Sequence, residues 1–227
     1  MSDNTKSDTF KLGNIVFNSL ENIAKKTGAV DERNLKYSQY IIKHVKKNSI
    51  VLDVGCNVGQ FSVECAKNGA QTLSIDFSRE MLGYIPKIDG INRLVCDAQN
   101  LPIKESAVDT ILAISVLEHL RTPELALNEF QRVIKTKGSL IVQIPNPEYF
   151  IEVHTKFPLI FLLPDSIKEK INNRTFGHYY TNFKLSKKKF LQIVTPFFSV
   201  IEIMPVYHKI KTPLWPPSWI MHLAKRP

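Results

Sequence analysis

The stretch VLDVGCNVGQF, residues 51–61, decides the fold of this chain. A short run of apolar and β-branched residues ends at Val54 and is followed by Gly55 and Gly59. A run of this length that stops at a glycine turn predicts a buried strand, and the residues after the turn predict a helix. A strand, a tight turn and a helix are the opening unit of a parallel sheet that is covered by helices.

The same alternation continues along the chain. Further strands are predicted at 72–76, 92–96, 108–115 and 139–144, with helices at 60–68, 79–84 and 123–136 between them. A helix at 186–194 and two closing strands at 200–207 and 220–224 follow. The sequence therefore predicts an α/β fold, a three-layer doubly wound Rossmann-like sheet of seven strands, mostly parallel with an antiparallel closing strand.

Local signals set the expected ends of several helices. Ser78 is predicted to cap the helix at 79–84, and Thr122 with Pro123 to begin the next one. That helix is expected to run to about Thr136 and to end at the Lys137-Gly138 pair. The predicted domains are a helical extension at 1–47 and one domain at 48–227, with an aromatic-rich insertion at about 145–182.

Composition limits the class of protein. Three cysteines without a CxxC pair predict a reducing compartment, and the polar N-terminus does not resemble a signal peptide, so a cytoplasmic location is expected. The longest apolar stretch outside the sheet, at 157–163, is too short for a transmembrane segment, which needs about 20 residues. The net charge of +9 comes from the flanks, since residues 51–144 hold 9 Lys/Arg against 11 Asp/Glu. Any anionic partner is therefore expected to bind the flanks, and the alternative is a solvated basic surface that only keeps the protein soluble.

The glycine spacing argues against a phosphate site. A dinucleotide fingerprint needs a third glycine near Gln60, and a P-loop needs a Gly-Lys-Ser/Thr sequence, but neither is present. Asn57 stands where the second glycine would be, and asparagine tolerates the left-handed conformation. Glycine without a side chain lets a ligand approach the backbone closely, so the turn predicts a ligand site at the carboxyl end of the first strand.

Five segments resemble, in order, the motifs of class I S-adenosylmethionine-dependent methyltransferases. They are VLDVGCNVGQF, LSIDFSREML, CDAQNLPIKESAVDTI, ILAISVLEHL and VIKTKGSLIVQIPN. The later segment FGHYYTNFKLSKKKFLQIV is similar to the one that often precedes the sixth strand. The resemblance spans roughly residues 48–206 and is nearest to the small-molecule, "type 11" or ubiquinone-biosynthesis-like enzymes. It implies a methyltransferase that uses S-adenosyl-L-methionine.

The resemblance also implies which residues bind the cofactor. Asp53 would orient the turn or reach the methionine ammonium, and Asp76 would accept hydrogen bonds from both ribose hydroxyls. Phe77 and Met81 would pack on the adenine, and Asp97 would accept a hydrogen bond from its amino group. The remaining cofactor-binding residues implied in this way are Gly55, Cys56, Asn57, Gly59, Ala98 and Ser115.

Methyl transfer needs placement of the acceptor and, for some acceptors, removal of a proton. His119 is the candidate base, because a histidine titrates near neutral pH. Glu118 would orient it, act itself, or serve as a metal ligand as in some relatives, although no metal site is predicted. His178 in the insertion is a candidate second base. Each of these side chains can instead be only part of the wall of the site.

The acceptor is left open by the sequence. A small-molecule acceptor is favoured, and the methyl group would be added to one of its O, N or C atoms. The acceptor would be amphipathic or lipid-linked if the insertion touches a bilayer through its basic residues. The alternatives are an RNA or DNA methyltransferase that uses the basic flanks, and a non-catalytic S-adenosylmethionine-binding partner of another enzyme. The Asn146-Pro-Glu-Tyr149 sequence resembles a nucleic-acid methylation motif but follows the fifth predicted strand, so we interpret it as a turn.

Overall fold

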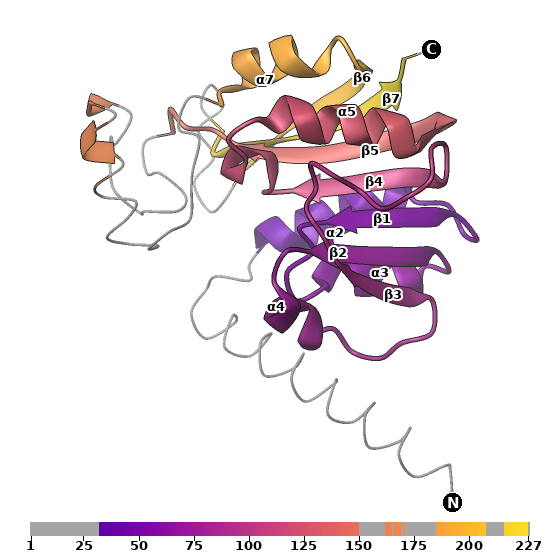
Figure 1. The fold of residues 1–227 in the computed structure, drawn as a ribbon. Coiled ribbons are helices and arrows are strands. Elements are labelled where there is room, and N and C mark those ends of the chain that lie inside the picture. Colours follow the sequence, from indigo (N-terminus) through magenta and orange to yellow (C-terminus); the bar gives the residue numbers. More distant parts are fainter. Residues whose placement is uncertain are drawn as a thin grey trace, which may run out of the picture.

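The computed structural model describes residues 32–149, 162–164, 166–168, 170, 185–207 and 216–226. Within them, seven strands form one sheet in the order β3-β2-β1-β4-β5-β7-β6 (Figure 1). Strands β1 to β5 pair in parallel, and β7 pairs antiparallel with both β5 and β6. The predicted α/β sheet is therefore confirmed. The strands are β1 Ile50–Val54, β2 Gln71–Asp76, β3 Ile91–Val95, β4 Val108–Ile114, β5 Ile134–Pro145, β6 Phe198–Val206 and β7 Ser218–Lys225.

Helices cover both faces of the sheet and complete the three layers (Figure 1). Helices α5 and α7 pack on one face, and helices α2 and α3 pack on the other. The short helix α4 follows β2, and a 3₁₀ turn, η1, follows β4. The described helices are α2 Glu32–His44, α3 Gln60–Lys67, α4 Arg79–Gly83, η1 Leu117–His119, α5 Pro123–Val133 and α7 Lys187–Val194.

Helix α2 lies over the middle of the sheet and belongs to the region where a helical extension is predicted. Tyr37, Tyr40 and Ile41 recur at helical spacing, and all three are buried. They pack in one cluster with Leu112 of β4, Ile141 of β5 and Ile220 of β7. The helix is therefore part of the hydrophobic core and forms a fixed wall above these three strands.

The predicted helix start at Ser78 is confirmed, and the one at Thr122 is only partly right. The Ser78 hydroxyl accepts a hydrogen bond from the Met81 N–H at 3.3 Å. Pro123 is the first residue of α5, as predicted, but Thr122 makes no side-chain capping bond. Its backbone carbonyl instead accepts the Leu125 N–H. The N-terminus of α5 thus relies on proline and the backbone rather than on the threonine side chain.

The predicted end of α5 at the Lys137-Gly138 pair is wrong. The helix stops at Val133, and Ile134 already pairs with Val108 of β4. Between the pairs Val108–Ile134 and Thr110–Ser139 the register shifts, so β5 bulges at this point. A Cβ on Gly138 would lie 2.8 Å from the Asp109 carbonyl oxygen. The glycine is required by close backbone contact within the sheet, not by a helix C-cap.

The interpretation of Asn146 as part of a turn after β5 is confirmed. Its side-chain oxygen accepts the Glu148 N–H at 3.1 Å, and its side-chain amide donates to the Pro216 carbonyl at 2.8 Å. Most of the predicted insertion at 145–182, including His178, lies outside the described residues. In the part of the chain that is described, no helix combines the length and apolar character that crossing a membrane requires.

Ile41→Ala tests whether α2 is part of the fold. Ile41 is fully buried between helix and sheet, so removing its side chain should lower the free energy of unfolding by about 2–5 kcal/mol. Leu35→Ala on the same helix is the matched control, because Leu35 is 60% exposed. Urea unfolding of both variants measures the difference. Equal, small effects would show that α2 does not stabilise the domain.

Candidate active site

The turn between β1 and α3 is built from left-handed residues. Gly55, Asn57 and Gly59 have φ angles of 60°, 51° and 74°. A Cβ on Gly55 would lie 2.6 Å from a methyl group of Val116, and one on Gly59 would lie 2.7 Å from Ile85. Asn57 accepts the left-handed conformation that the sequence predicts for it. The turn therefore brings bare backbone to the carboxyl edge of the sheet.

The Asp76 carboxylate joins this turn to the next one. Asp76 is the last residue of β2, and its side chain is 7% exposed. Its Oδ2 accepts the Asn57 N–H and its Oδ1 accepts the Ser78 N–H, both at 2.9 Å. A carboxylate has about four lone-pair sites, so roughly two remain for a ligand.

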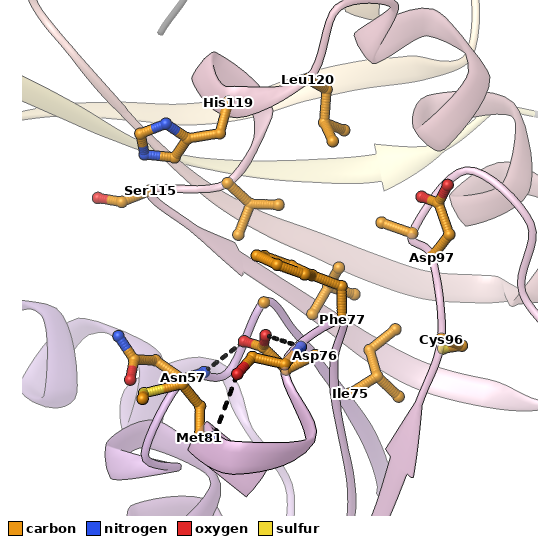
Figure 2. A pocket seen from close by; sticks show the side chains of 15 residues that line it. Asn57, Ile75, Asp76, Phe77, Met81, Cys96, Asp97, Ser115, His119 and Leu120 are labelled. Atoms are coloured by element: carbon orange, nitrogen blue, oxygen red, sulfur yellow. Dashed lines mark hydrogen bonds between the residues drawn. The ribbon is translucent and has the colours of Figure 1, made fainter. Parts of the chain in front are cut away.

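A cavity of about 550 Å³ opens above this carboxylate. Figure 2 shows Asp76 near the foot of the cavity, the Phe77 ring across its middle, and His119 and Ser115 on another wall. Phe77 is 71% exposed. Asp97 is also exposed, and its carboxylate accepts the Gln99 N–H within the same turn. A flat polar ring could stack on the accessible aromatic face and donate a hydrogen bond to the accessible carboxylate. The other lining residues that the sequence predicts are Gly55, Asn57, Met81 and Ala98.

A second cavity, of about 420 Å³, adjoins the first and shares four lining residues with it. The shared residues are Gly55, Asn57, Ser115 and His119. Its other walls come from α2, from α3, and from the ends of β1, β4, β5 and β7. They include Asn34, Tyr37, Asp53, Cys56, Gln60, Phe61, Ile114, Gln143, Pro145 and Ser218. The four shared residues thus form the junction between the two spaces.

Neither cavity is lined by lysine or arginine within the described residues. The described residues also contain no group of three or more His, Cys, Asp or Glu side chains that could hold a metal ion. A cofactor bearing phosphate groups would find no cationic side chain among these walls. The walls instead fit a nucleoside-like ligand without phosphate.

Asp53 lies at the base of the second cavity and is 2% exposed. Burial raises the pKa of this carboxyl to about 7, although the hydrogen bond from Ser62 opposes the shift. The Ser62 hydroxyl donates to Asp53 at 2.5 Å and lies 2.7 Å from the Ser74 hydroxyl. Asp53 thus contacts α3 directly and remains within reach of a ligand in the cavity.

The structure separates the two residues of the predicted catalytic pair. His119 lines both cavities, at the end of η1. Glu118 is 1% exposed and lines neither cavity. Ser115, just before η1, has a φ of 56°, a strained conformation that is common at functional sites. The geometry favours contact of His119 with a ligand, whereas Glu118 is buried outside both cavities.

Two other predicted residues occupy supporting positions. The Cys56 side chain packs with Leu82 and Ile85, and burial raises the pKa of its thiol far above the ordinary range. The thiol is therefore held in its neutral form, although Cys56 also lines the second cavity. Gly59 lines neither cavity and instead forms the N-terminal cap of α3.

Sequence reasoning missed the residues that α2, β5 and β7 add to the second cavity. Tyr37 and Ser218 are buried, and their hydroxyl oxygens lie 2.8 Å apart. Gln143 is 3% exposed in the middle of β5. Gln143 could have been predicted as a site residue, because it is a polar residue in an otherwise apolar predicted strand. Tyr37 follows the apolar stripe of its helix, so its sequence position does not indicate a site.

Comparisons with known proteins point to one family. Residues 52–142 match the model of a family described as "Methyltransferase domain". An uncharacterised protein of Methanocaldococcus jannaschii is 37% identical over 127 residues, which are 55% of this chain and 53% of that protein. A mouse protein named "Probable tRNA methyltransferase 9B" is 30% identical over 102 residues, 44% of this chain and 22% of that protein. The chain thus spans about half or less of the length of these relatives.

The fold is shared with solved structures at low sequence identity. A crystal structure of an S-adenosylmethionine dependent methyltransferase from Mesorhizobium loti superposes with a TM-score of 0.66 at 14% identity. The match covers 84% of this chain and 96% of that one. At this identity the likeness concerns the fold alone.

Asp53→Asn tests the cost of the buried carboxyl. Because the folded pKa is raised, the folded state binds more protons than the unfolded state between about pH 4 and 7, so stability falls as the pH rises through this range. The variant should therefore be more stable than the parent at pH 8, by on the order of 4 kcal/mol. The difference should vanish near pH 4. Thermal melts across this range measure it.

Asp109→Asn is the matched control for Asp53→Asn and should give the opposite sign. Burial alone would raise the pKa of Asp109, but the Ile50 N–H and the Lys135 ammonium hold this pKa below its usual value. Its carboxylate therefore stabilises the fold at neutral pH. Destabilisation of both variants at pH 8 would contradict the interpretation of Asp53.

The strand order, the left-handed turn after β1, the acid at the end of β2 and the matched domain all agree. Residues 52–142 match the methyltransferase-domain family model, and the sheet around them has the fold of solved S-adenosylmethionine-dependent methyltransferases.

Proposed function

We propose that this protein transfers a methyl group from S-adenosyl-L-methionine to an O, N or C atom of a small-molecule acceptor. The observation that carries the proposal is the junction between the two cavities. Each cavity is large enough for a small ligand, and His119, Ser115 and the glycine turn border both. A cofactor in the first cavity and an acceptor in the second would thus meet beside His119.

The first cavity would hold the adenosine part of the cofactor. The free lone pairs of Asp76 would accept hydrogen bonds from the ribose hydroxyls, while its other two positions keep the turn in place. Phe77 would stack on the adenine, with Met81 beside it, and Asp97 would accept from the adenine amino group. The absence of lysine and arginine from the described walls supports a cofactor without phosphate.

The methionine part would extend across the glycine turn toward the second cavity. Asp53 lines that cavity next to Gly55 and would face the cofactor's ammonium in its ionised form. An ammonium nearby would favour the ionised carboxylate and so offset the burial that raises its pKa. Binding of the cofactor would thus compensate for the cost of a buried acid.

S-adenosylmethionine, when bound, supplies a methyl group on a sulfonium that is already activated for transfer. The residues of the chain then have two tasks, to exclude water and to orient the acceptor. His119 borders both cavities and would take a proton from an acceptor hydroxyl or amine. Glu118 is buried and lines neither cavity, so it would not touch the acceptor.

A nucleic-acid acceptor is the second candidate. The basic flanks, at +4 for residues 1–50 and +7 for residues 145–227, and the mouse relative named as a tRNA methyltransferase favour it. A cavity of about 420 Å³ accommodates one extruded base as well as a free small molecule. RNA binding that weakens steeply with added salt would favour this candidate over the small-molecule one.

Asp76→Ala tests the cofactor. The variant loses a buried charged acceptor, worth about 1.5–3 kcal/mol, so its affinity for S-adenosylmethionine should fall by roughly 10- to 100-fold. Calorimetric titration with S-adenosylmethionine and with NAD measures the affinity of parent and variant. The parent should bind only S-adenosylmethionine. Absence of S-adenosylmethionine binding by the folded parent protein would overturn the proposed function.

Two further variants sharpen this test. Asp97→Ala removes a carboxylate that makes only local bonds with Gln99, so it probes the adenine contact without disturbing the glycine turn. Asp89→Ala removes an exposed acid in the loop before β3, outside both cavities, and should leave the affinity unchanged. Equal losses in all three variants would indicate a general charge effect rather than a site.

A further inference from the structure

Gln143 is a buried polar residue in the second cavity whose purpose the fold does not explain. It lies in β5 between Val142 and Ile144, which are both fully buried, and it is itself 3% exposed. Burying a side-chain amide is costly unless its donors and its acceptor are all hydrogen-bonded. An apolar residue here would serve the sheet better.

The contacts of Gln143 satisfy only one end of its amide. Its Oε1 accepts a hydrogen bond from the Ser115 hydroxyl, and its backbone carbonyl accepts the Ser115 N–H at 3.3 Å. Within the described residues no hydrogen bond engages its Nε2, and the residue lines the second cavity. Ser115 therefore fixes the amide, and the two N–H donors are left for a molecule in the cavity.

We propose that Gln143 determines acceptor specificity by donating a hydrogen bond from Nε2 to an uncharged oxygen atom of the acceptor. The acceptor class would be a neutral hydroxyl or carbonyl compound. This inference rests on the proposed function, since it assigns the second cavity to the acceptor. Gln143 lies beside Ser115 and shares the cavity with His119, so an oxygen held by the amide would lie near the candidate base.

The other described walls favour a neutral molecule. Asp53 is the one acidic side chain among the residues that line the cavity, and lysine and arginine are absent from them. An anionic group on the acceptor would find no cationic side chain among these walls. Phe61, Ile114 and Pro145 add apolar surface. A protonated amine would leave the Nε2 donors without an acceptor, so an oxygen-bearing neutral compound fits best.

Gln143→Glu is the sharpest test. Glutamate keeps the shape and the oxygen that accepts from Ser115, but it replaces the two donors with a second, negatively charged acceptor. The probes are benzamide, benzoate and benzylamine, which differ in charge on a common ring. Their binding is measured by saturation-transfer NMR with S-adenosylhomocysteine bound in the first cavity. The parent protein should bind benzamide best.

In Gln143→Glu, benzamide affinity should fall by about tenfold or more, and benzylamine should become the preferred probe. A purely structural role for Gln143 would weaken all three probes together and would not reverse their order. The proposal is overturned if the order is unchanged, if benzoate binds best to the parent protein, or if none of the three binds. Gln143→Leu removes the donors without adding charge, so it should bind benzamide more weakly and should not bind benzylamine more tightly. This variant replaces Gln143→Glu if the glutamate variant does not fold.

Gln71→Glu is the matched control, because the same substitution is made at an exposed position at the opposite end of the sheet. It should keep the parent's order of probes. Titration of S-adenosylhomocysteine alone separates the two proposals. Failure of that titration would overturn the proposed function. Normal binding of S-adenosylhomocysteine with an unchanged probe order in Gln143→Glu would overturn only the role of Gln143.

Discussion

The site depends on one carboxylate that joins two turns of the chain. Asp76 accepts the backbone N–H groups of Asn57 and Ser78, and so it couples the end of β2 to the turn after β1. The left-handed residues of that turn have no regular ladder to hold them, so an acceptor on the neighbouring strand fixes the direction of the Asn57 N–H. The pairing of β1 with β2 in parallel is what brings this acceptor to the turn. The residue that we propose to bind the cofactor therefore also shapes the site.

The second cavity has a different origin, since it exists because α2 packs on the sheet. Tyr40 and Ile41 anchor the helix to the layer below, while Tyr37 and Asn34 face the cavity one turn earlier. The antiparallel strand β7 begins where β5 ends, which places Ser218 beside Pro145. Elements from the first and last parts of the described chain thus enclose a space that the central strands alone would leave open.

The sequence predicts the sheet and the first cavity well because their determinants are local. Strand-ending acids, a glycine turn and the capping serine at Ser78 each act within a few residues, and the structure places them as expected. The second cavity could not be predicted in this way, because Gln143 and Ser218 meet only through the register of β5 with β7. Gly138 misled for the same reason, since the contact that requires a glycine comes from β4, 29 residues earlier at Asp109.

The face of the sheet beneath α2 shows how stability is exchanged for function. Val51, Leu112 and Ile141 on this face are apolar and fully buried. Asp53 lies in register with Leu112, and Gln143 lies two residues beyond Ile141 on β5. Both are 2–3% exposed and only partly supplied with hydrogen-bond partners by the protein. Polar groups in such positions lower stability unless a ligand completes their bonds. They persist where a site needs them, so we interpret the carboxyl ends of β1 and β5 as the part of this face that is suited to a ligand rather than to folding alone.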